Sequence, residues 1–283
     1  MIAITGATGQ LGRLVIESLL ETVDPGTIVA AVRSPEKAAD LAARGVQVRH
    51  ADYDRPDTLQ VAFAGVERVL LISSSETGGR VPQHRAVIDA ARAAGVALVA
   101  YTSILHADRS PLELATEHRE TEALLAASGL ATIVLRNGWY TENYLLALQP
   151  ALQHGAMLGA ARDGRISLAA RADYAAAAAR ALTSDGQSRI YELAGDTAWT
   201  LADFAAEIAR QSGRAVAYRD LPQADFAAAM VGFGTPAALA GLVADADARA
   251  ADGALYDDGH ALSRLIGRPT TPVPETVAVA LAG

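Results

Sequence analysis

The strongest constraint on this fold lies in the first twenty residues, where a short apolar run breaks into a glycine-rich turn. The stretch MIAITGATGQLG places Gly6, Gly9 and Gly12 directly after residues 2–4, an apolar run typical of a buried strand. Apolar residues then recur at helical spacing over residues 11–20. The pattern predicts a strand, a tight glycine turn and a helix in immediate succession.

A turn of this kind suits a phosphate group. The first N–H groups of a helix are unpaired, and the positive end of the helix dipole favours an anion there. Glycines at positions 6 and 9 let a pyrophosphate approach the backbone, and glycine at 12 lets the helix pack close to the strand. A purely structural turn is the alternative. We predict a dinucleotide site that includes Gly6, Thr8, Gly9, Gln10, Leu11 and Gly12.

Strand-like and helix-like segments alternate along the first half of the chain. The expected strands are residues 28–32, 46–48, 69–72, 98–101 and 132–135, and the expected helices are 35–43, 83–94 and 113–127. Repeated βα units predict the α/β class, a Rossmann-like, doubly wound parallel sheet. We assign residues 1–150 to this dinucleotide-binding domain, which also receives part of 165–185.

The regular alternation loosens after Arg136. We expect residues 151–283 to form a smaller, discontinuous α/β domain that covers the substrate. Two helices, at 140–153 and 172–182, are expected before the strand at 190–193. After that strand we expect a helix at 201–211 with Thr200 as its N-cap, a strand at 215–218, and helices through Ile266.

The composition narrows the possible partners. The net charge is −8 and Lys/Arg clusters are absent from the sequence, so we expect neither nucleic acid nor an anionic membrane as a partner. The chain has no cysteine and its six histidines lack paired spacing, so no metal site is expected. A chemically difficult step would therefore have to be supplied by a cofactor. The chain starts directly on a strand, which favours a cytoplasmic location. The sequence does not determine the oligomeric state, and a homo-oligomer is one of the alternatives.

The end of the second predicted strand bears on the choice of dinucleotide. NAD-selective folds place an acidic residue there, whereas this sequence reads VAAVRSPEK, with Arg33. A guanidinium can form charge-assisted bonds with a 2′-phosphate, assisted by Ser34 and Lys37. We therefore predict NADPH rather than NADH. The alternative is that Arg33 is a solvated residue at a strand end.

Three further segments follow strands and supply candidate cofactor contacts. Asp52, in HADYD, either reaches the adenine or caps the next turn. The serines of LLISSSE either line the nicotinamide ribose and phosphates or form a turn. The candidates from these segments and from the end of the fifth strand are Asp52, Ser73, Ser74, Ser75 and Tyr101.

Taken together, several blocks resemble one family. TGATGQLG, VRSPEKA, LLISSSE, QHRAVIDAARAAGV, AYTSILHAD, LRNGWYTENY and YELAGD–AWTL are similar to the type 2 NAD(P)H:quinone oxidoreductases, in the NmrA-like branch of the atypical short-chain dehydrogenases. The resemblance runs over essentially the whole chain. It implies an NADPH-dependent reductase with a quinone as acceptor. Triphenylmethane dye reductases are a related branch.

The chain lacks the catalytic residue pair of ordinary short-chain dehydrogenases. Those enzymes use Tyr-x-x-x-Lys, and Lys37 is the only lysine in this sequence. At the corresponding helix, His118 precedes Glu122 by four residues, which indicates either a proton-donating or ribose-orienting pair or a solvated helix face. Ser103 lies near the usual position of the catalytic serine, or it merely finishes a strand.

The stretch RNGWYTENY contains both asparagines of the protein. Amide groups can orient a carbonyl oxygen, and aromatic faces can stack on a planar ring. We predict substrate contacts from Asn137, Trp139, Tyr140 and Asn143, with Asn137 also a catalytic candidate. The alternative makes the aromatic residues part of an interdomain core.

These observations lead to a hypothesis of direct two-electron hydride transfer from NADPH to a quinone. Hydride addition to a quinone forms a stabilised phenolate, so geometry matters more than an acid. Two rival functions are a redox sensor that binds the dinucleotide without turnover, and a dye or enone reductase.

Overall fold

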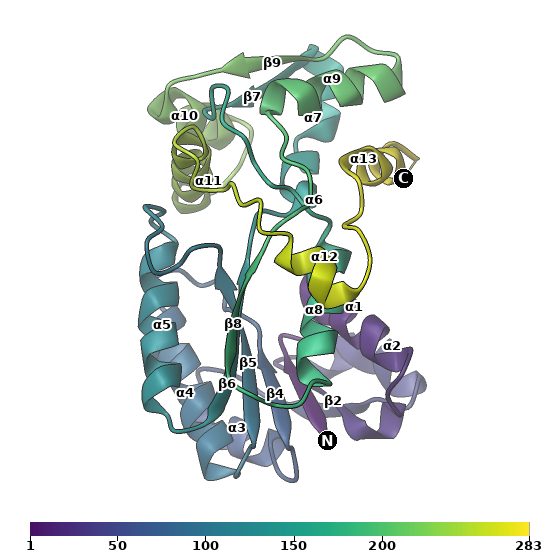
Figure 1. Ribbon diagram of the computed structural model, residues 1–283, viewed down its shortest axis with the longest axis vertical. Coiled ribbons are helices and arrows are strands. Elements are labelled where there is room, and N and C mark those ends of the chain that lie inside the picture. The colour runs from purple at the N-terminus through teal and green to yellow at the C-terminus, as the bar shows by residue number, and fades with distance from the viewer. Residues whose placement is uncertain (283) are drawn as a thin grey trace. The chain divides into compact units, whose positions relative to one another are not determined.

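The computed structural model describes residues 1–282 (Figure 1). A seven-stranded sheet has the order β3-β2-β1-β4-β5-β6-β8. Neighbouring strands from β3 through β6 pair in parallel. This arrangement confirms the predicted Rossmann-like, doubly wound sheet. The strands are β1 (Ile2–Thr5), β2 (Ile28–Val32), β3 (Gln47–His50), β4 (Arg68–Leu71), β5 (Leu98–Ile104), β6 (Ala131–Asn137) and β8 (Arg189–Leu193).

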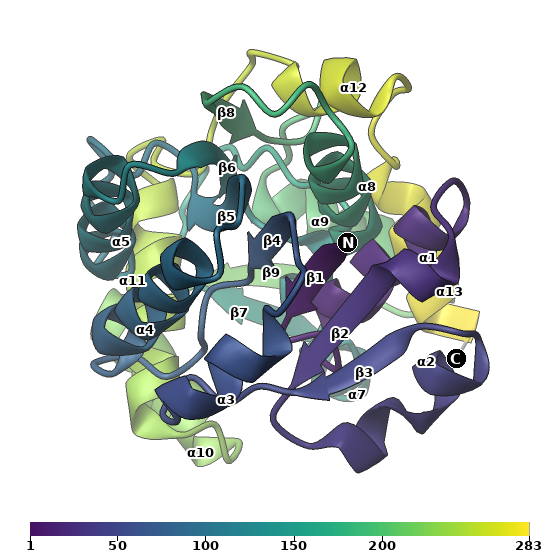
Figure 2. The same cartoon turned by 90° about the horizontal axis from the view of Figure 1, so that it is seen from below.

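Helices cover both faces of this sheet. Helices α3, α4 and α5 lie against one face, and α1 and α8 lie against the other (Figures 1 and 2). Short 3-10 turns, η1 (Pro25–Thr27) and η2 (Pro35–Ala38), flank β2. The helices of this part are α1 (Gln10–Leu20), α2 (Ala39–Ala43), α3 (Pro56–Ala62), α4 (Arg80–Ala93), α5 (Ala115–Ala127) and α8 (Arg171–Leu182).

Every second residue of the central strands packs under α3, α4 and α5. Ala3, Val29, Val69 and Val99 come from four neighbouring strands, are fully buried and belong to one hydrophobic cluster, which includes Phe63. The intervening strand residues face the opposite way, as the two-residue period of a strand requires. Apolar residues on both faces explain why these strands read as continuous apolar runs.

The chain divides into two compact units. The first unit comprises Met1–Ala107, Thr116–Asn137 and Ala172–Tyr191, and the second comprises Asp108–Ala115, Gly138–Arg171 and Glu192–Gly283. The break after Asn137 comes earlier than the predicted boundary at residue 150. The segment that returns to the first unit, Ala172–Tyr191, includes part of the predicted 165–185 and continues beyond it into β8, the strand next to β6 in the sheet.

The second unit holds a small parallel sheet of β7 and β9. The predicted single helix at 140–153 is wrong, because two short helices replace it. Pro150 lies in the first turn of the second of these, where its missing N–H needs no partner, and a continuous helix would bring the proline ring against the Leu146 carbonyl. The elements are α6 (Thr141–Leu145), α7 (Leu148–His154), β7 (Ala156–Gly159), α9 (Leu201–Ser212), β9 (Ala217–Asp220), α10 (Gln223–Gly232), α11 (Ala237–Ala250), α12 (Ala261–Ile266) and α13 (Val273–Ala282).

The predicted cap at Thr200 is confirmed as a full capping box. The Thr200 hydroxyl accepts a hydrogen bond from the Asp203 N–H at 3.0 Å, and the Asp203 carboxylate accepts one from the Thr200 N–H. This reciprocal pair satisfies two of the otherwise unpaired groups at the start of α9.

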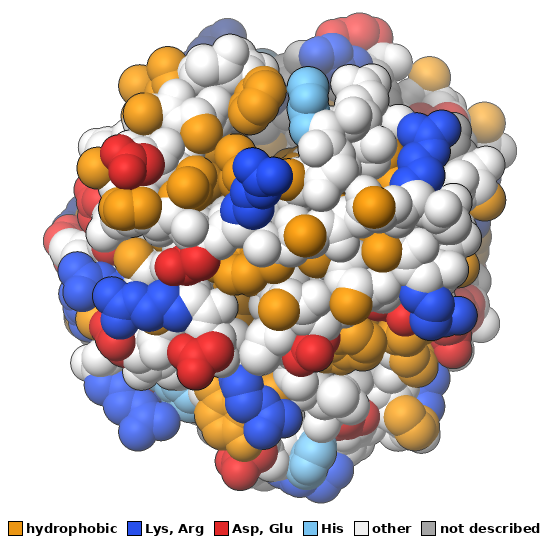
Figure 3. Space-filling view, turned by 90° about the horizontal axis from the view of Figure 1, so that it is seen from above, with side chains coloured by type: hydrophobic (Ala, Val, Ile, Leu, Met, Phe, Trp, Pro, Cys, Tyr) orange, Lys and Arg blue, Asp and Glu red, His pale blue; other side chains and the backbone are white. Residues whose placement is uncertain are grey.

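Charged side chains of both signs are scattered over the face shown in Figure 3, among apolar ones. Over residues 1–282, no helix is both long enough and apolar enough to cross a membrane. Within the same range, no cluster of three or more histidine and acidic side chains could hold a metal ion.

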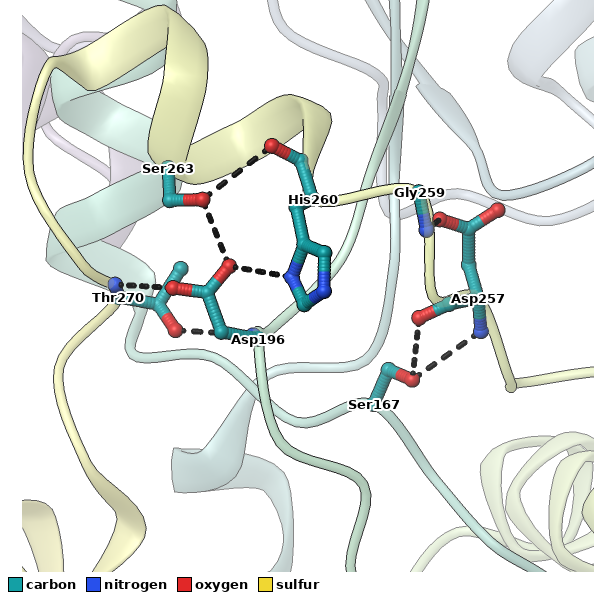
Figure 4. A network of polar contacts seen from close by, with 7 residues as sticks. All are labelled: Ser167, Asp196, Asp257, Gly259, His260, Ser263 and Thr270. Atoms are coloured by element: carbon teal, nitrogen blue, oxygen red, sulfur yellow. Dashed lines mark hydrogen bonds and ion pairs between the residues drawn. The ribbon is translucent and has the colours of Figure 1, made fainter.

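A polar network fastens α12 within the second unit (Figure 4). The Asp196 carboxylate accepts hydrogen bonds from the Ser263 hydroxyl at 2.7 Å, His260 Nδ1 at 3.0 Å and the Thr270 N–H at 2.9 Å. Because the carboxylate lies between serine and histidine, the hydroxyl donates to Asp196 instead of to the imidazole. This order differs from that of a nucleophilic triad, so the network is structural.

Candidate functional site

A pocket of about 390 Å³ opens at the carboxyl ends of β1 to β4, within the first unit. Each of these strands is followed by residues that line it, which is where open parallel sheets bind ligands. The lining comprises Gly6, Thr8, Gly9, Gln10, Leu11, Gly12, Arg33, Ala51, Asp52, Tyr53, Asp54, Ile72, Ser73, Ser74, Ser75, Glu76 and Gln83.

The glycine turn forms one wall of the pocket. Gly6 has a φ of +59°, a conformation that side chains rarely adopt, and its carbonyl accepts the Gly9 N–H at 2.9 Å. A Cβ at Gly12 would lie 2.4 Å from the Gly6 carbonyl oxygen and 2.8 Å from Ala7 Cα. Gly12 therefore permits the close approach of α1 to the turn. The N-cap of α1 is Gly9, and no described side chain caps that end, so its N–H groups suit an anion.

Arg33 lines the pocket from the end of β2 and contacts the segment that follows β4. Its guanidinium forms an ion pair with Glu76 at 3.2 Å, and both side chains are more than half exposed. Gln83, from α4, donates from Nε2 to the other Glu76 carboxylate oxygen at 2.8 Å and to Asp54 at 3.1 Å. These four residues form a continuous polar chain along the pocket.

Two buried side chains of α4 hold the peptide groups of Ser74. The Ser74 N–H donates to His84 Nε2 at 2.9 Å, and Arg80 Nε donates to the Ser74 carbonyl at 2.7 Å. Since Nε2 accepts, Nδ1 carries the proton and donates to the Thr121 hydroxyl, which donates in turn to the Glu117 carbonyl. Burial, and secondarily the charge of Arg80, lowers the pKa of His84 to about 3. The neutral ring therefore keeps the same hydrogen bonds throughout the physiological range.

Thr5 links the turn to the neighbouring strand. Its hydroxyl donates to the Leu70 carbonyl at 3.0 Å and accepts from the Ile72 N–H at 3.0 Å. The Tyr53 hydroxyl lies 2.5 Å from the same oxygen. The strand ends on either side of the pocket are thereby tied together.

The predicted Tyr101 contact lies away from this lining. Tyr101 is fully buried, and its hydroxyl lies 2.7 Å from His118 Nδ1. His118 is also buried, which contradicts a solvated helix face at this position. Burial lowers the pKa of His118 well below its usual value, so the ring is neutral at pH 7. A neutral imidazole is a weak proton donor, which disfavours the proton-donating interpretation.

Glu122 pairs with Arg136 and Ser103. Arg136 donates to both carboxylate oxygens, at 3.0 and 2.7 Å, and the Ser103 hydroxyl donates to one of them at 2.5 Å. Ser103 lies on β5 and is 5% exposed. The expected His118–Glu122 pair is thus replaced, among the bonds described, by a Tyr101–His118 pair and a Ser103–Glu122–Arg136 cluster.

The four predicted substrate contacts fall on both sides of the break after residue 137. Asn137 ends β6 in the first unit and is buried, and its carbonyl accepts the Leu105 N–H at 2.9 Å. In the second unit, Trp139 is 9% exposed, whereas Tyr140 and Asn143 are half-buried. The Arg171 guanidinium lies over the Tyr140 ring, 4.9 Å from its centre. Their roles toward a substrate stay predictions.

The pocket thus brings together all of the predicted cofactor residues except two. Tyr101 is buried in the network above, and Lys37 is an exposed residue of η2 outside the lining. Sequence reasoning missed Ala51, Tyr53, Asp54, Ile72, Glu76 and Gln83. Five of these lie within HADYD or LLISSSE themselves and could have been found by treating each motif as a whole. Gln83 could not, because it arrives from α4.

Comparisons with known proteins agree with this geometry. A family model described as NAD(P)H-binding matches residues 6–185. Quinone oxidoreductase 2 of Escherichia coli is 58% identical over 279 residues, 98% of each chain. An NmrA-like family domain-containing oxidoreductase of Aspergillus flavus is 33% identical over 79% of this chain and 75% of its own.

Two solved structures are similar over nearly their full length. The crystal structure of the NADPH-dependent quinone oxidoreductase of E. coli, complexed with NADPH, has a TM-score of 0.96 and covers 99% of each chain. The Citrobacter sp. triphenylmethane reductase complexed with NADP(H) has a TM-score of 0.94 at 37% identity, covering 99% of this chain and all of its own.

Fold and pocket together define a nucleotide-binding protein of the Rossmann-like class. More particularly, the chain belongs to the NAD(P)H-binding, NmrA-like family that includes quinone oxidoreductase 2.

Proposed function

We propose that this protein is an NADPH-dependent quinone reductase that transfers two electrons directly as hydride. The observation that carries the proposal is the pocket itself, which combines a phosphate-binding turn with Arg33 at the end of β2. The 58% identity to the E. coli quinone oxidoreductase over almost the whole chain supports the same activity.

The residues of the pocket fit NADPH. The uncapped start of α1 beside Gly6 and Gly9 suits the pyrophosphate, and the Arg33 guanidinium suits the 2′-phosphate. The Ser73–Ser75 segment, held by α4, is proposed to bind the ribose and phosphate oxygens. When bound, the nicotinamide would supply the hydride.

The acceptor contacts are proposed from the RNGWYTENY stretch. Asn137 and Asn143 would orient the quinone oxygens, and Trp139 and Tyr140 would stack on its ring. Addition of hydride to a quinone leaves a stabilised phenolate, so the chain's residues act chiefly by orientation. Ser103, whose hydroxyl donates to Glu122, is proposed as a hydroxyl near the reacting ring rather than as a strong acid.

The partners and the location extend this proposal. A chain with a net charge of −8 and charges of both signs on its surface suits a small neutral acceptor better than a nucleic acid. We propose a cytoplasmic location, where an NADPH-dependent enzyme meets its cofactor. Cell fractionation tests the location, and light scattering after size-exclusion chromatography tests for a homo-oligomer.

The decisive experiment follows absorbance at the NADPH band with purified protein, a simple benzoquinone, and either NADPH or NADH. We expect enzyme-dependent oxidation that favours NADPH over NADH, measured against a reaction without protein. Tight NADPH binding without turnover on any acceptor would contradict the reductase and favour a redox sensor.

A dye is the second candidate acceptor, favoured by the 37% identity and 0.94 TM-score to triphenylmethane reductase. A panel of benzoquinones, naphthoquinones, triphenylmethane dyes and enones separates the two. We expect kcat/KM to be higher for a quinone than for any dye or enone.

A further inference from the structure

Glu76 is paired with Arg33, the residue proposed above to bind the 2′-phosphate of NADPH. The pocket residues that the structure describes include one cationic side chain, Arg33, and three carboxylates, Asp52, Asp54 and Glu76. The Arg33 guanidinium is paired with Glu76 Oε1 at 3.2 Å. A phosphate that binds Arg33 must therefore displace this carboxylate or share the guanidinium with it.

Gln83 holds the Glu76 carboxylate in position through a hydrogen bond. Gln83 is 6% exposed, and its Nε2 donates to Glu76 Oε2 at 2.8 Å and to Asp54 at 3.1 and 3.3 Å. A flipped amide would place its oxygen against two carboxylates, so the orientation is set by charge. Its buried Oε1 has no partner in the described residues, which the two charge-assisted bonds on the nitrogen offset.

We propose that Glu76 is a specificity-determining residue that competes with the 2′-phosphate for Arg33. The inference rests on the proposed use of NADPH and adds a residue that opposes it. NADH has a 2′-hydroxyl in place of the phosphate, so it can bind while the Arg33–Glu76 pair stays intact. NADPH has to displace Glu76 from Arg33 or share the guanidinium with it, and in either case it brings a dianion close to the Glu76 carboxylate. Glu76 therefore limits the preference that Arg33 creates.

The test is a pair of equilibrium titrations that follow the fluorescence of NADPH and of NADH on binding to the full chain. Glu76→Gln removes the charge and retains an oxygen for Gln83. The variant frees Arg33 from an exposed ion pair, which is a weak interaction, and it also removes the repulsion between the carboxylate and the phosphate. We expect NADPH to bind about three- to tenfold more tightly and NADH to change less than about twofold.

The matched control is Glu120→Gln, an equal change of charge at an exposed position of α5 outside the pocket. It should leave both dissociation constants unchanged. In 1 M salt the effect of Glu76→Gln should shrink, because charges are then screened within about 3 Å. An unchanged or weakened affinity for NADPH, or an equal gain for NADH, overturns the proposal.

A double-mutant cycle locates the effect at Arg33. With Arg33→Ala already present, Glu76→Gln should improve NADPH binding by a smaller factor, because only the direct repulsion remains. Equal factors in both backgrounds would overturn competition for the guanidinium. These readouts measure binding alone, so a wild-type chain that binds NADPH but reduces no acceptor contradicts the reductase without affecting this test. Absence of NADPH binding contradicts both.

Discussion

At the scale of single residues, selectivity for the cofactor depends on which charges meet at the end of β2. Arg33 was recognised from the sequence because an acidic residue is usual at that place in NAD-selective folds. Its partner Glu76, 43 positions further along the chain, was not. No local pattern predicts a contact between two segments that are joined only through the sheet.

Replacement of Arg33 tests the phosphate contact directly. Arg33→Ala removes a charge-assisted bond and should cost about 1.5–3 kcal/mol of NADPH binding free energy, but much less for NADH. Calorimetric titration with both nucleotides measures the two losses. Equal losses would remove Arg33 from the explanation of selectivity.

His84 should act as a positioning residue for Ser74. His84→Leu removes the acceptor of the part-buried Ser74 N–H, at a cost of about 1–3 kcal/mol in unfolding free energy, and should raise KM for NADPH more than it lowers kcat. The glutamine of His84→Gln can accept from the Ser74 N–H and donate to the Thr121 hydroxyl. This variant should therefore restore much of the unfolding free energy and much of the affinity reflected in KM.

The pH profile separates this role from acid–base catalysis. Because the pKa of His84 is about 3, its contribution to KM should stay constant between pH 5 and 8. A ratio of wild-type to His84→Gln KM that changes near pH 6.5 would show that the ring titrates in function.

At the scale of elements, the β1–turn–α1 unit was predicted closely because its signals are local. The strand, the glycines and the apolar helix spacing lie within twenty residues, and the backbone requirement at Gly6 and Gly12 is steric. The prediction of one helix over 140–153 was wrong because the apolar periodicity continues through the break between α6 and α7, which Pro150 favours. Periodicity identifies the buried face but not the ends of a helix.

The close approach at Gly12 predicts that even a methyl group is harmful there. Gly12→Ala should force the turn away from α1, lower the free energy of unfolding by about 1–3 kcal/mol and weaken NADPH binding. Chemical denaturation and nucleotide titration measure the two effects.

Gly241→Ala is the matched control for this substitution. Gly241 lies on α11 with open space where a Cβ would be added, so alanine should stabilise the protein by about 0.5–1 kcal/mol through helix propensity. A Gly12→Ala variant as stable as wild type would contradict the steric argument.

At the scale of the whole molecule, a buried carboxyl makes stability depend on pH. Asp247, on α11, is fully buried, and burial raises its pKa to about 6 although it accepts hydrogen bonds from the Tyr144 hydroxyl and the Ala160 N–H. The folded state therefore binds this proton more tightly than the unfolded state does. The resulting stability is fully present below about pH 3.8 and is lost as pH rises through 6.

A variant with no titrating group at this position isolates the effect. The difference in unfolding free energy between wild type and Asp247→Asn should fall by about 2–3 kcal/mol from pH 4 to pH 7, since one pKa unit corresponds to about 1.4 kcal/mol. Urea denaturation at several pH values measures it. A constant difference over this range would mean that Asp247 is not protonated at pH 4 in the folded protein.

The sequence by itself determined the features that depend on neighbouring residues. These are the alternation of strands and helices, the parallel sheet that follows from it, the phosphate turn, the capping box at Thr200 and the cation at the end of β2. Each is set by backbone sterics, hydrophobic periodicity or local hydrogen bonding. The tertiary structure alone decided which distant groups meet: Glu76 with Arg33, His84 with Ser74, Tyr101 with His118, and Ser103 with Glu122. It also decided that the chain breaks into units after Asn137 instead of at 150. These outcomes depend on long-range packing and on which polar groups become buried together, and neither is encoded in any short stretch of the chain.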